Sequence, residues 1–175
     1  AGQGGTTRPA NLRGVPVKAW GASTDAGRFD QGGVYATFDL HSNGNMRPWA
    51  YKSSDFGRTW TSLLAAGSPV RGYAHVIKQD LVNPKLLFLG TEFGLYVSVD
   101  DGGNWARYKG GNLPSVAVRD LAIHPRDNDL VIATHGRGIC IVDDITPLRG
   151  LTPQVLGADG SFAKVRPTVA RLSAG

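Results

Sequence analysis

The feature that most constrains the fold is a short motif, Ser-x-Asp-x-Gly-x-x-Trp, that occurs twice with a spacing of 45 residues. Its two copies consist of Ser53, Asp55, Gly57 and Trp60, and of Ser98, Asp100, Gly102 and Trp105. A third, partial repeat follows, because the segment from Leu86 overlays the segment from Leu130 at a shift of 44. Internal repeats of this length predict a fold built from repeated structural units.

Each repeat carries short β-type runs that are divided by turn residues. The runs lie at 17–22, 34–39, 49–53 and 60–64, then at 73–78, 86–90, 95–99 and 105–109, and finally at 119–124, 130–134 and 139–142. Four-stranded units of about 40 to 50 residues in tandem are typical of β-propeller blades, because one small sheet cannot bury both of its faces. We therefore predict an all-β fold with two full blades of four antiparallel strands and one partial blade, all part of a larger propeller.

The repeats also predict the organisation of the chain. We expect a linker or cut end at 1–16, a blade at 17–66 with its motif at 53–60, a blade at 70–110 with its motif at 98–105, a partial last blade at 117–145, and an exit segment or linker at 146–175. Known propellers have about four blades or more. We therefore expect further blades, from the same protein or from another chain, as partners.

Composition argues against several classes of function. The net charge of +5 is dispersed, without the basic and aromatic patch of a nucleic-acid binder, and no apolar run reaches the roughly 20 residues of a membrane span. The single cysteine, Cys140, takes the place of Tyr96 in the repeat, which favours a buried packing role. No ligand spacing for a metal and no dinucleotide fingerprint occur, so we expect no metal and no cofactor.

The repeated motif is explained better by structure than by catalysis. It falls in the hairpin between the third and fourth strands, where Asp55 and Asp100 can accept backbone N–H bonds. The glycines supply positive φ angles, the serine hydroxyls tie the turn back, and we expect both tryptophans to be buried under it. The motif is therefore predicted to lock a hairpin.

Strand order then predicts where a ligand site lies. In an up-and-down sheet, the turns between strands 1 and 2 and between 3 and 4 share one face, and the turns between strands 2 and 3 lie on the other. The motif occupies the first face, which leaves the opposite rim to segments 40–47, 91–93 and 135–137. The candidate ligand-binding residues on this rim are His41, Arg47, Glu92, Phe93, His135 and Arg137.

The motif resembles the Asp box, or BNR repeat, with Asn104 in place of Thr in the second copy. Across roughly Gly33 to Leu151, the chain looks like the C-terminal blades of bacterial sortilin-like and BNR glycosyl-hydrolase-like propellers. The resemblance implies a secreted protein, extracellular or periplasmic, that acts as a binding scaffold for a peptide, a protein or a glycan.

The alternative that the resemblance leaves open is a xyloglucanase-like glycoside hydrolase, so whether the chain is an enzyme stays undecided here. Such hydrolysis needs two carboxyl groups about 5 Å or about 6.5 to 9.5 Å apart. The candidates are Glu92, the only glutamate in the chain, with Asp39 and Asp120, and the remaining carboxylates would lie in blades outside this chain. The favoured interpretation is that Glu92 pairs with Arg47 or Arg137 and fixes the spacing between blades.

Overall fold

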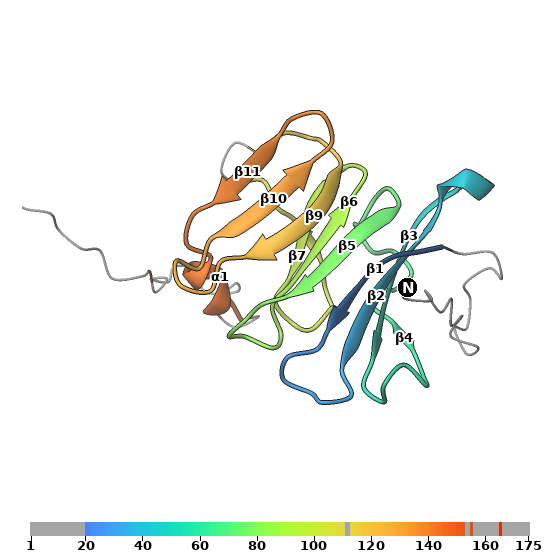
Figure 1. The fold of residues 1–175 in the computed structure, drawn as a ribbon, viewed down its shortest axis with the longest axis horizontal. Helices are drawn as coiled ribbons and strands as arrows, with labels where there is room; N and C mark the ends of the chain where they lie inside the picture. The colour runs from blue at the N-terminus through green and yellow to red at the C-terminus, as the bar shows by residue number, and fades with distance from the viewer. Residues whose placement is uncertain (1–19, 111–112, 153–154, 156–164, 166–175) are drawn as a thin grey trace, which may run out of the picture.

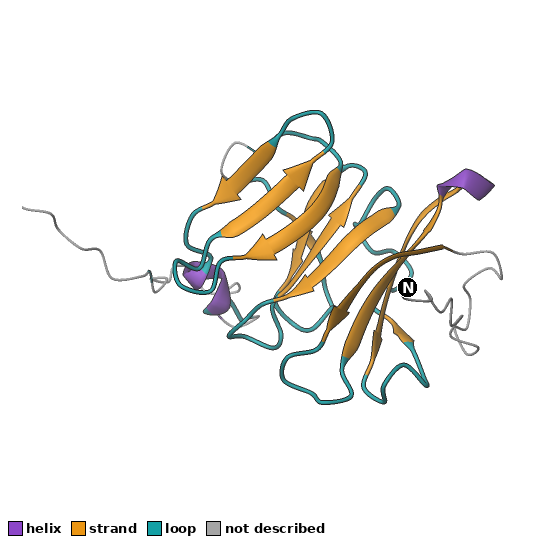
Figure 2. Cartoon of the chain, viewed as in Figure 1, coloured by secondary structure: helices purple, strands orange, loops and turns teal. Residues whose placement is uncertain are grey.

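Three antiparallel sheets lie side by side in the computed structural model, which describes residues 20–110, 113–152, 155 and 165 (Figures 1 and 2). The first sheet, blade 1, contains β1 (Trp20–Ala26), β2 (Val34–Leu40), β3 (Asn45–Ser53) and β4 (Thr61–Ser62). Blade 2 contains β5 (Ala74–Gln79), β6 (Leu87–Thr91), β7 (Gly94–Ser98) and β8 (Ala106–Arg107). Blade 3 contains β9 (Val118–Ile123), β10 (Leu130–Thr134) and β11 (Ile139–Val142). The predicted all-β architecture of propeller blades is confirmed.

The first blade differs from the prediction at its strand ends. β1 continues to Ala26, four residues beyond its predicted end, and pairs there with Val34, because the turn that follows is closed by the Gly27 amide donating to the Gly33 carbonyl. β3 begins at Asn45 instead of residue 49, since its ladder with β2 continues up to a short 3-10 turn, η1 (His41–Asn43). Residues 17–19 of the first predicted strand lie outside the described part of the chain.

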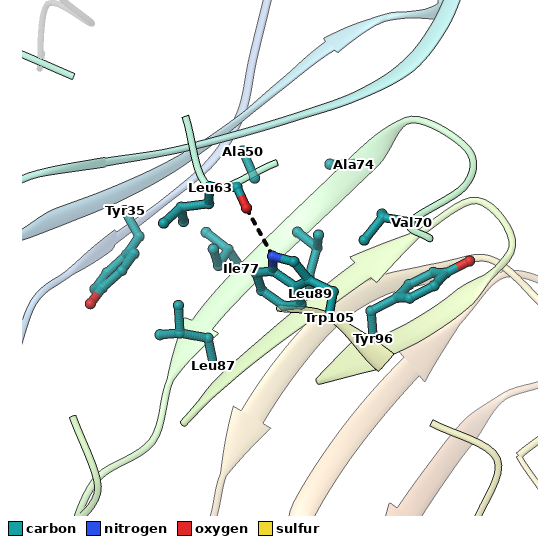
Figure 3. Packing of buried hydrophobic residues seen from close by; sticks show 10 residues of the cluster. All are labelled: Tyr35, Ala50, Leu63, Val70, Ala74, Ile77, Leu87, Leu89, Tyr96 and Trp105. Carbon is teal, nitrogen blue, oxygen red and sulfur yellow. Dashed lines mark hydrogen bonds between the residues drawn. The ribbon is translucent and has the colours of Figure 1, made fainter. Parts of the chain in front are cut away.

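Two hydrophobic clusters join the three blades, and the middle blade contributes to both. Between blades 1 and 2, Tyr35, Leu63 and Trp105 pack with Ile77 and Leu89 (Figure 3). Between blades 2 and 3, a second cluster is made by residues that include Val76, Phe88, Leu95, Val118 and Ile132. Every residue of β6 is buried, because blade 2 is covered on both faces. This is why Leu86–Leu89 reads as a continuous apolar run.

A short helix, α1 (Thr146–Arg149), follows blade 3 and fastens it to blade 2. The Arg149 guanidinium donates from Nε and Nη2 to the fully buried carboxylate of Asp80, over 2.8 and 2.9 Å, and from Nη1 to Asn128 Oδ1. Burial raises the pKa of Asp80, but the hydrogen bonds from Arg149 and the backbone outweigh it and hold the pKa below its usual range. The predicted exit segment 146–175 thus begins with this helix, and most of the remainder lies outside the described residues.

Candidate functional site

The two Asp-box hairpins, β3–β4 and β7–β8, contain the same set of hydrogen bonds. In the first box, the Ser53 hydroxyl donates to Asp55 Oδ1 over 2.8 Å and accepts from the Gly57 amide over 2.9 Å. In the second, Ser98 repeats both bonds with Asp100 and Gly102 at the same distances. The glycines have φ angles of 80° and 90°. The box therefore closes its own turn, as predicted.

The one departure from the motif, Asn104, preserves the bonding. Thr59 donates its amide and its hydroxyl to the two oxygens of Asp55. Asn104 donates its amide and its side-chain Nδ2 to the two oxygens of Asp100, over 2.8 and 2.7 Å. The Thr59 hydroxyl bond is the main reason that the pKa of Asp55 falls to about 2. For Asp100, burial raises the pKa, and the bonds from Asn104 and Ser98 still bring it below its usual range. Both carboxylates are held ionised in structural bonds.

The two box tryptophans differ: Trp105 is buried, but against the preceding blade, and Trp60 contacts its own turn without being fully buried. The expectation that each is buried under its own turn is met in part by each. Trp105 is buried and its indole Nε1 donates over 2.9 Å to the carbonyl of Leu63 in the preceding blade (Figure 3). Trp60 is half-buried and donates to Gly57 of its own turn. Burial of this side chain thus depends on the neighbouring blade.

The opposite rim, at the top of Figure 1, carries a polar network centred on Glu92. Glu92 Oε2 lies 3.1 Å from Nε2 of His75 and 3.7 Å from Nη2 of Arg119. Arg119 Nη1 lies 3.3 Å from the other ring nitrogen of His75, Nδ1. The interpretation that Glu92 forms an ion pair between blades is therefore right, but the predicted partners, Arg47 and Arg137, are wrong. The arginine that reaches Glu92 is Arg119 of β9, in the next blade.

Blade 1 extends this network through stacked rings. The His41 ring stacks on Tyr73 with centroids 4.6 Å apart, and its Nδ1 lies 2.7 Å from Asp39 Oδ1. Tyr73 in turn meets the ring of His75 edge-on at 4.8 Å. We call these side chains the rim network; its members are Asp39, His41, Tyr73, His75, Glu92 and Arg119.

The rim network shifts the pKa of two of its members, Glu92 and His75. Burial raises the pKa of Glu92, but the hydrogen bonds from His75 and Tyr73 and the charge of Arg119 lower it by more. The pKa of Glu92 is therefore below its usual range, and the side chain is ionised at neutral pH. Burial is also the main reason that the pKa of His75 is lowered, and Arg119 adds to it while Glu92 opposes it. At neutral pH the centre of the network therefore consists of the Glu92 carboxylate, the Arg119 guanidinium and the uncharged imidazole of His75.

Of the predicted rim residues, the structure brings only His41 and Glu92 into this network, together with the catalytic candidate Asp39. Arg47 lies over the Trp49 ring, 5.4 Å from its centroid, and Phe93 is half exposed. His135 and Arg137 are exposed in the turn between β10 and β11. The binding roles of these four remain predictions.

The third catalytic candidate, Asp120, is exposed on β9 and accepts the amide of Leu121. Cys140 is half-buried against the cluster between blades 2 and 3. In the described part of the chain, no group of three His, Cys, Asp or Glu side chains is placed to hold a metal, and no helix there is long and apolar enough to cross a membrane.

Sequence reasoning missed Tyr73, His75 and Arg119. One signal was present: the shift of 44 that aligns blades 2 and 3 also places His75 opposite Arg119, at the same position of successive first strands. Two polar residues at equivalent positions of neighbouring blades are candidates for a contact, and here they make one.

Comparison with solved structures finds several that are similar to this chain. The GH74 xyloglucanase from Xanthomonas campestris matches with a TM-score of 0.54 and 21% identity, over 83% of this chain and 23% of that one. YCF48 bound to a D1 peptide matches with a TM-score of 0.44 and 18% identity, over 66% and 34%. PorZ, a surface component of the type-IX secretion system of Porphyromonas gingivalis, matches with a TM-score of 0.46 and 25% identity, over 66% and 17%.

This chain thus spans about a third or less of the length of these three proteins. No protein-family model matches it, and no curated protein matches it significantly. What the similarity to the GH74 xyloglucanase establishes is the β-propeller fold.

Proposed function

We propose that this chain is part of a secreted, sortilin-like Asp-box β-propeller that binds a peptide, a protein or a glycan at the rim opposite the Asp boxes. The observation that carries the proposal is that three consecutive blades contribute to one polar network on that rim. His41 comes from blade 1, Glu92 from blade 2 and Arg119 from blade 3. Loops and strand ends on a rigid scaffold are where binding residues concentrate.

Several side chains in the network combine fixed positions with access to solvent. The side chain of His41 is 50% exposed and that of Arg119 is 41% exposed, whereas the side chain of His75 behind them is 6% exposed. A buried residue that orients exposed charged residues is the arrangement that binding sites need. The outer groups can therefore contact a polar ligand without first becoming ordered.

The state of Glu92 favours binding over hydrolysis. A general acid in glycoside hydrolysis needs a raised pKa, whereas the pKa of Glu92 is lowered by its hydrogen bonds and by Arg119. Asp39, a second carboxyl candidate, is engaged by His41. Xyloglucanase-like hydrolysis is therefore the alternative that the experiment must distinguish from binding without turnover.

Further blades are proposed as partners on the exposed face of blade 3. Ile139 and Ile141 of β11 are 69% and 55% exposed, although the equivalent residues of blade 2, Leu95 and Val97, pack against the cluster shared with blade 3. Large exposed apolar side chains on a sheet face mark an interaction surface. A neighbouring blade, from this protein or another chain, would cover them, and the proposed location of the ring is extracellular or periplasmic.

Binding is tested by probing peptide and glycan arrays with the protein and repeating the positive probes with Arg119→Gln and Glu92→Gln. We expect either substitution to weaken binding about tenfold or more, because each leaves the other charge without its partner. The matched controls are Arg126→Gln and Asp127→Asn, which change an exposed ion pair on the Asp-box face and should bind as the unsubstituted protein does.

Equal binding by the rim variants and the controls would contradict the proposed site. Release of sugar from a bound glycan that collapses in Glu92→Gln or Asp39→Asn would support the hydrolase alternative instead.

A further inference from the structure

The two ring nitrogens of His75 make contacts that only one form of the imidazole satisfies. Arg119 Nη1 is always a donor, so Nδ1 at 3.3 Å must accept and carry no proton. Glu92 Oε2 at 3.1 Å is a carboxylate oxygen, so Nε2 must donate its proton. The neutral tautomer with its proton on Nε2 is therefore the form that joins Glu92 of blade 2 to Arg119 of blade 3.

Protonation of His75 breaks one of these contacts and keeps the other. A proton on Nδ1 would place an N–H donor against the guanidinium and a positive charge beside another positive charge, while the bond to Glu92 would be retained and strengthened. Arg119 can leave, because its side chain is 41% exposed, whereas His75 cannot, because its side chain is 6% exposed. The contact between blades 2 and 3 at this rim would open on the Arg119 side.

The other groups near His75 do not remove this conflict. Tyr73, in the segment before β5, contacts the His75 ring edge-on. His41 of η1 stacks on Tyr73, and Asp39 of β2 is paired with His41. The hydroxyl of Thr37 in blade 1 donates to the backbone carbonyl of His75 and holds the residue in place. Glu92 and, as the smallest contribution, the charge of Asp39 favour the charged imidazole, and Glu92 already shares its oxygen with Arg119.

We infer that His75 is a pH-sensitive coupler between blades 2 and 3, which holds Arg119 in the rim network when neutral and releases it when protonated. Release leaves the rim with one more positive charge and with a free guanidinium. As a statement about ligand binding, this regulation rests on the proposed function, and it predicts that anionic ligands bind more tightly in mild acid. The contact itself is tested without any ligand.

The experiment is ring-nitrogen and backbone NMR of the protein between about pH 7.5 and about pH 4.5, the range in which histidine charges while most carboxylates stay ionised. At the neutral end, we expect the proton of His75 on Nε2 and a bare Nδ1. On acidification, the backbone signals of Val118, Arg119 and Asp120 should shift together with the His75 ring. This shift should be lost in His75→Gln, which retains a neutral donor and acceptor, and kept in the matched control His41→Gln.

Three results would overturn the inference: a proton on Nδ1 at neutral pH, a β9 shift that persists in His75→Gln, or a β9 shift that disappears in His41→Gln. If His75→Gln does not fold, the tautomer and the common titration of the ring and β9 in the unsubstituted protein decide the question. A failure to find any ligand would count against the proposed function and would leave this result intact.

Discussion

The two Asp boxes have the same hairpin but different surroundings. Within each hairpin, the bonds of the Ser hydroxyl to the Asp carboxylate and from the Gly amide have the same lengths. Outside it, Trp105 and Asp101 of the second box contact blade 1, whereas Trp60 is half-buried and Phe56, which occupies the position of Asp101, is 68% exposed. No described strand covers that side of the first box.

The comparison separates two properties of the motif. Closure of the turn depends on residues within eight positions of one another and is complete in both copies. Docking to a preceding blade uses the tryptophan and the residue directly after the box aspartate, which is Phe56 in the first copy and Asp101 in the second. These contacts are present only in the second copy. The motif is therefore a hairpin lock that also offers an inter-blade contact.

Replacing the two tryptophans gives the largest expected difference. Trp105→Ala should lower the free energy of unfolding by about 3 to 5 kcal/mol, because it opens a cavity between blades 1 and 2 and leaves the Leu63 carbonyl without its donor. Trp60→Ala should cost about 1 to 2 kcal/mol, because less of its surface is buried. Urea unfolding of both variants measures the difference, and equal losses would show that the neighbouring blade contributes nothing to this side chain.

Substitution of the box glycines, Gly57 and Gly102, tests the same difference between the two boxes, because an added Cβ would meet different neighbours at the two positions. A Cβ at Gly102 would lie 2.6 Å from Cδ2 of Leu63 in blade 1, whereas a Cβ at Gly57 would meet only Trp60 of its own box, at 3.4 Å. Both have positive φ, which costs a non-glycine residue about 1 to 2 kcal/mol. We expect Gly57→Ala to lose about that amount and Gly102→Ala about 2 to 4 kcal/mol, with the crowding added.

Thermal or urea unfolding of the two alanine variants provides the measurement. A loss at Gly57 as large as at Gly102 would mean that strain in the turn, and not the contact with Leu63, sets the cost.

The parts of this molecule that could be predicted from its sequence are those set by neighbours in the chain. The bonds of Asp55 and Asp100, the strands of each blade and the face that the boxes occupy all follow from local spacing and from strand alternation. Even the replacement of Thr by Asn104 fits the local motif, because either side chain can donate to the carboxylate of the box aspartate.

The rim network could not be predicted in the same way, because its members come from three blades. Glu92 was identified, but its partner depends on how far each blade is turned relative to the next, which no spacing within a repeat reports. Blade 3 contains both Arg119 and Arg137. Only the packing of β9 against β5 and β6 shows that Arg119 is the arginine that reaches the Glu92 carboxylate. Similarly, the burial of Trp60 depends on a neighbour that the described chain does not contain.

The carboxylate of Asp101 offers a smaller test with a spectroscopic readout. It accepts from the Tyr35 hydroxyl over 3.2 Å and from Lys52 Nζ over 2.5 Å, both in blade 1. Burial and then the charge of Asp101 raise the pKa of Tyr35 above its ordinary 10.0. This raised pKa stabilises the folded protein below pH 10, and the stabilisation is lost as the pH rises through the folded value.

Asp101→Asn should lower the free energy of unfolding by about 1 kcal/mol or less, because the ion pair is partly exposed. It should also lower the pKa of Tyr35 while leaving it above the ordinary value, since burial remains. Ultraviolet titration of tyrosinate measures this shift, with Asp30→Asn as a control that removes a more weakly acting charge. An unchanged titration of Tyr35 would show that Asp101 does not act across the blades.

The smallest expected effect belongs to Phe56, the counterpart of Asp101. Its φ of 60° is unfavourable for an aromatic residue, and its ring is 68% exposed, so little burial offsets the strain. Phe56→Asn should therefore raise the free energy of unfolding by a few tenths of a kcal/mol up to about 1, because Asn tolerates this conformation. Urea unfolding of Phe56→Asn beside Phe56→Ala separates relief of strain from loss of the ring. A loss of stability in both variants would mean that the Phe56 ring already has a packing partner, and that the first box is docked as the second one is.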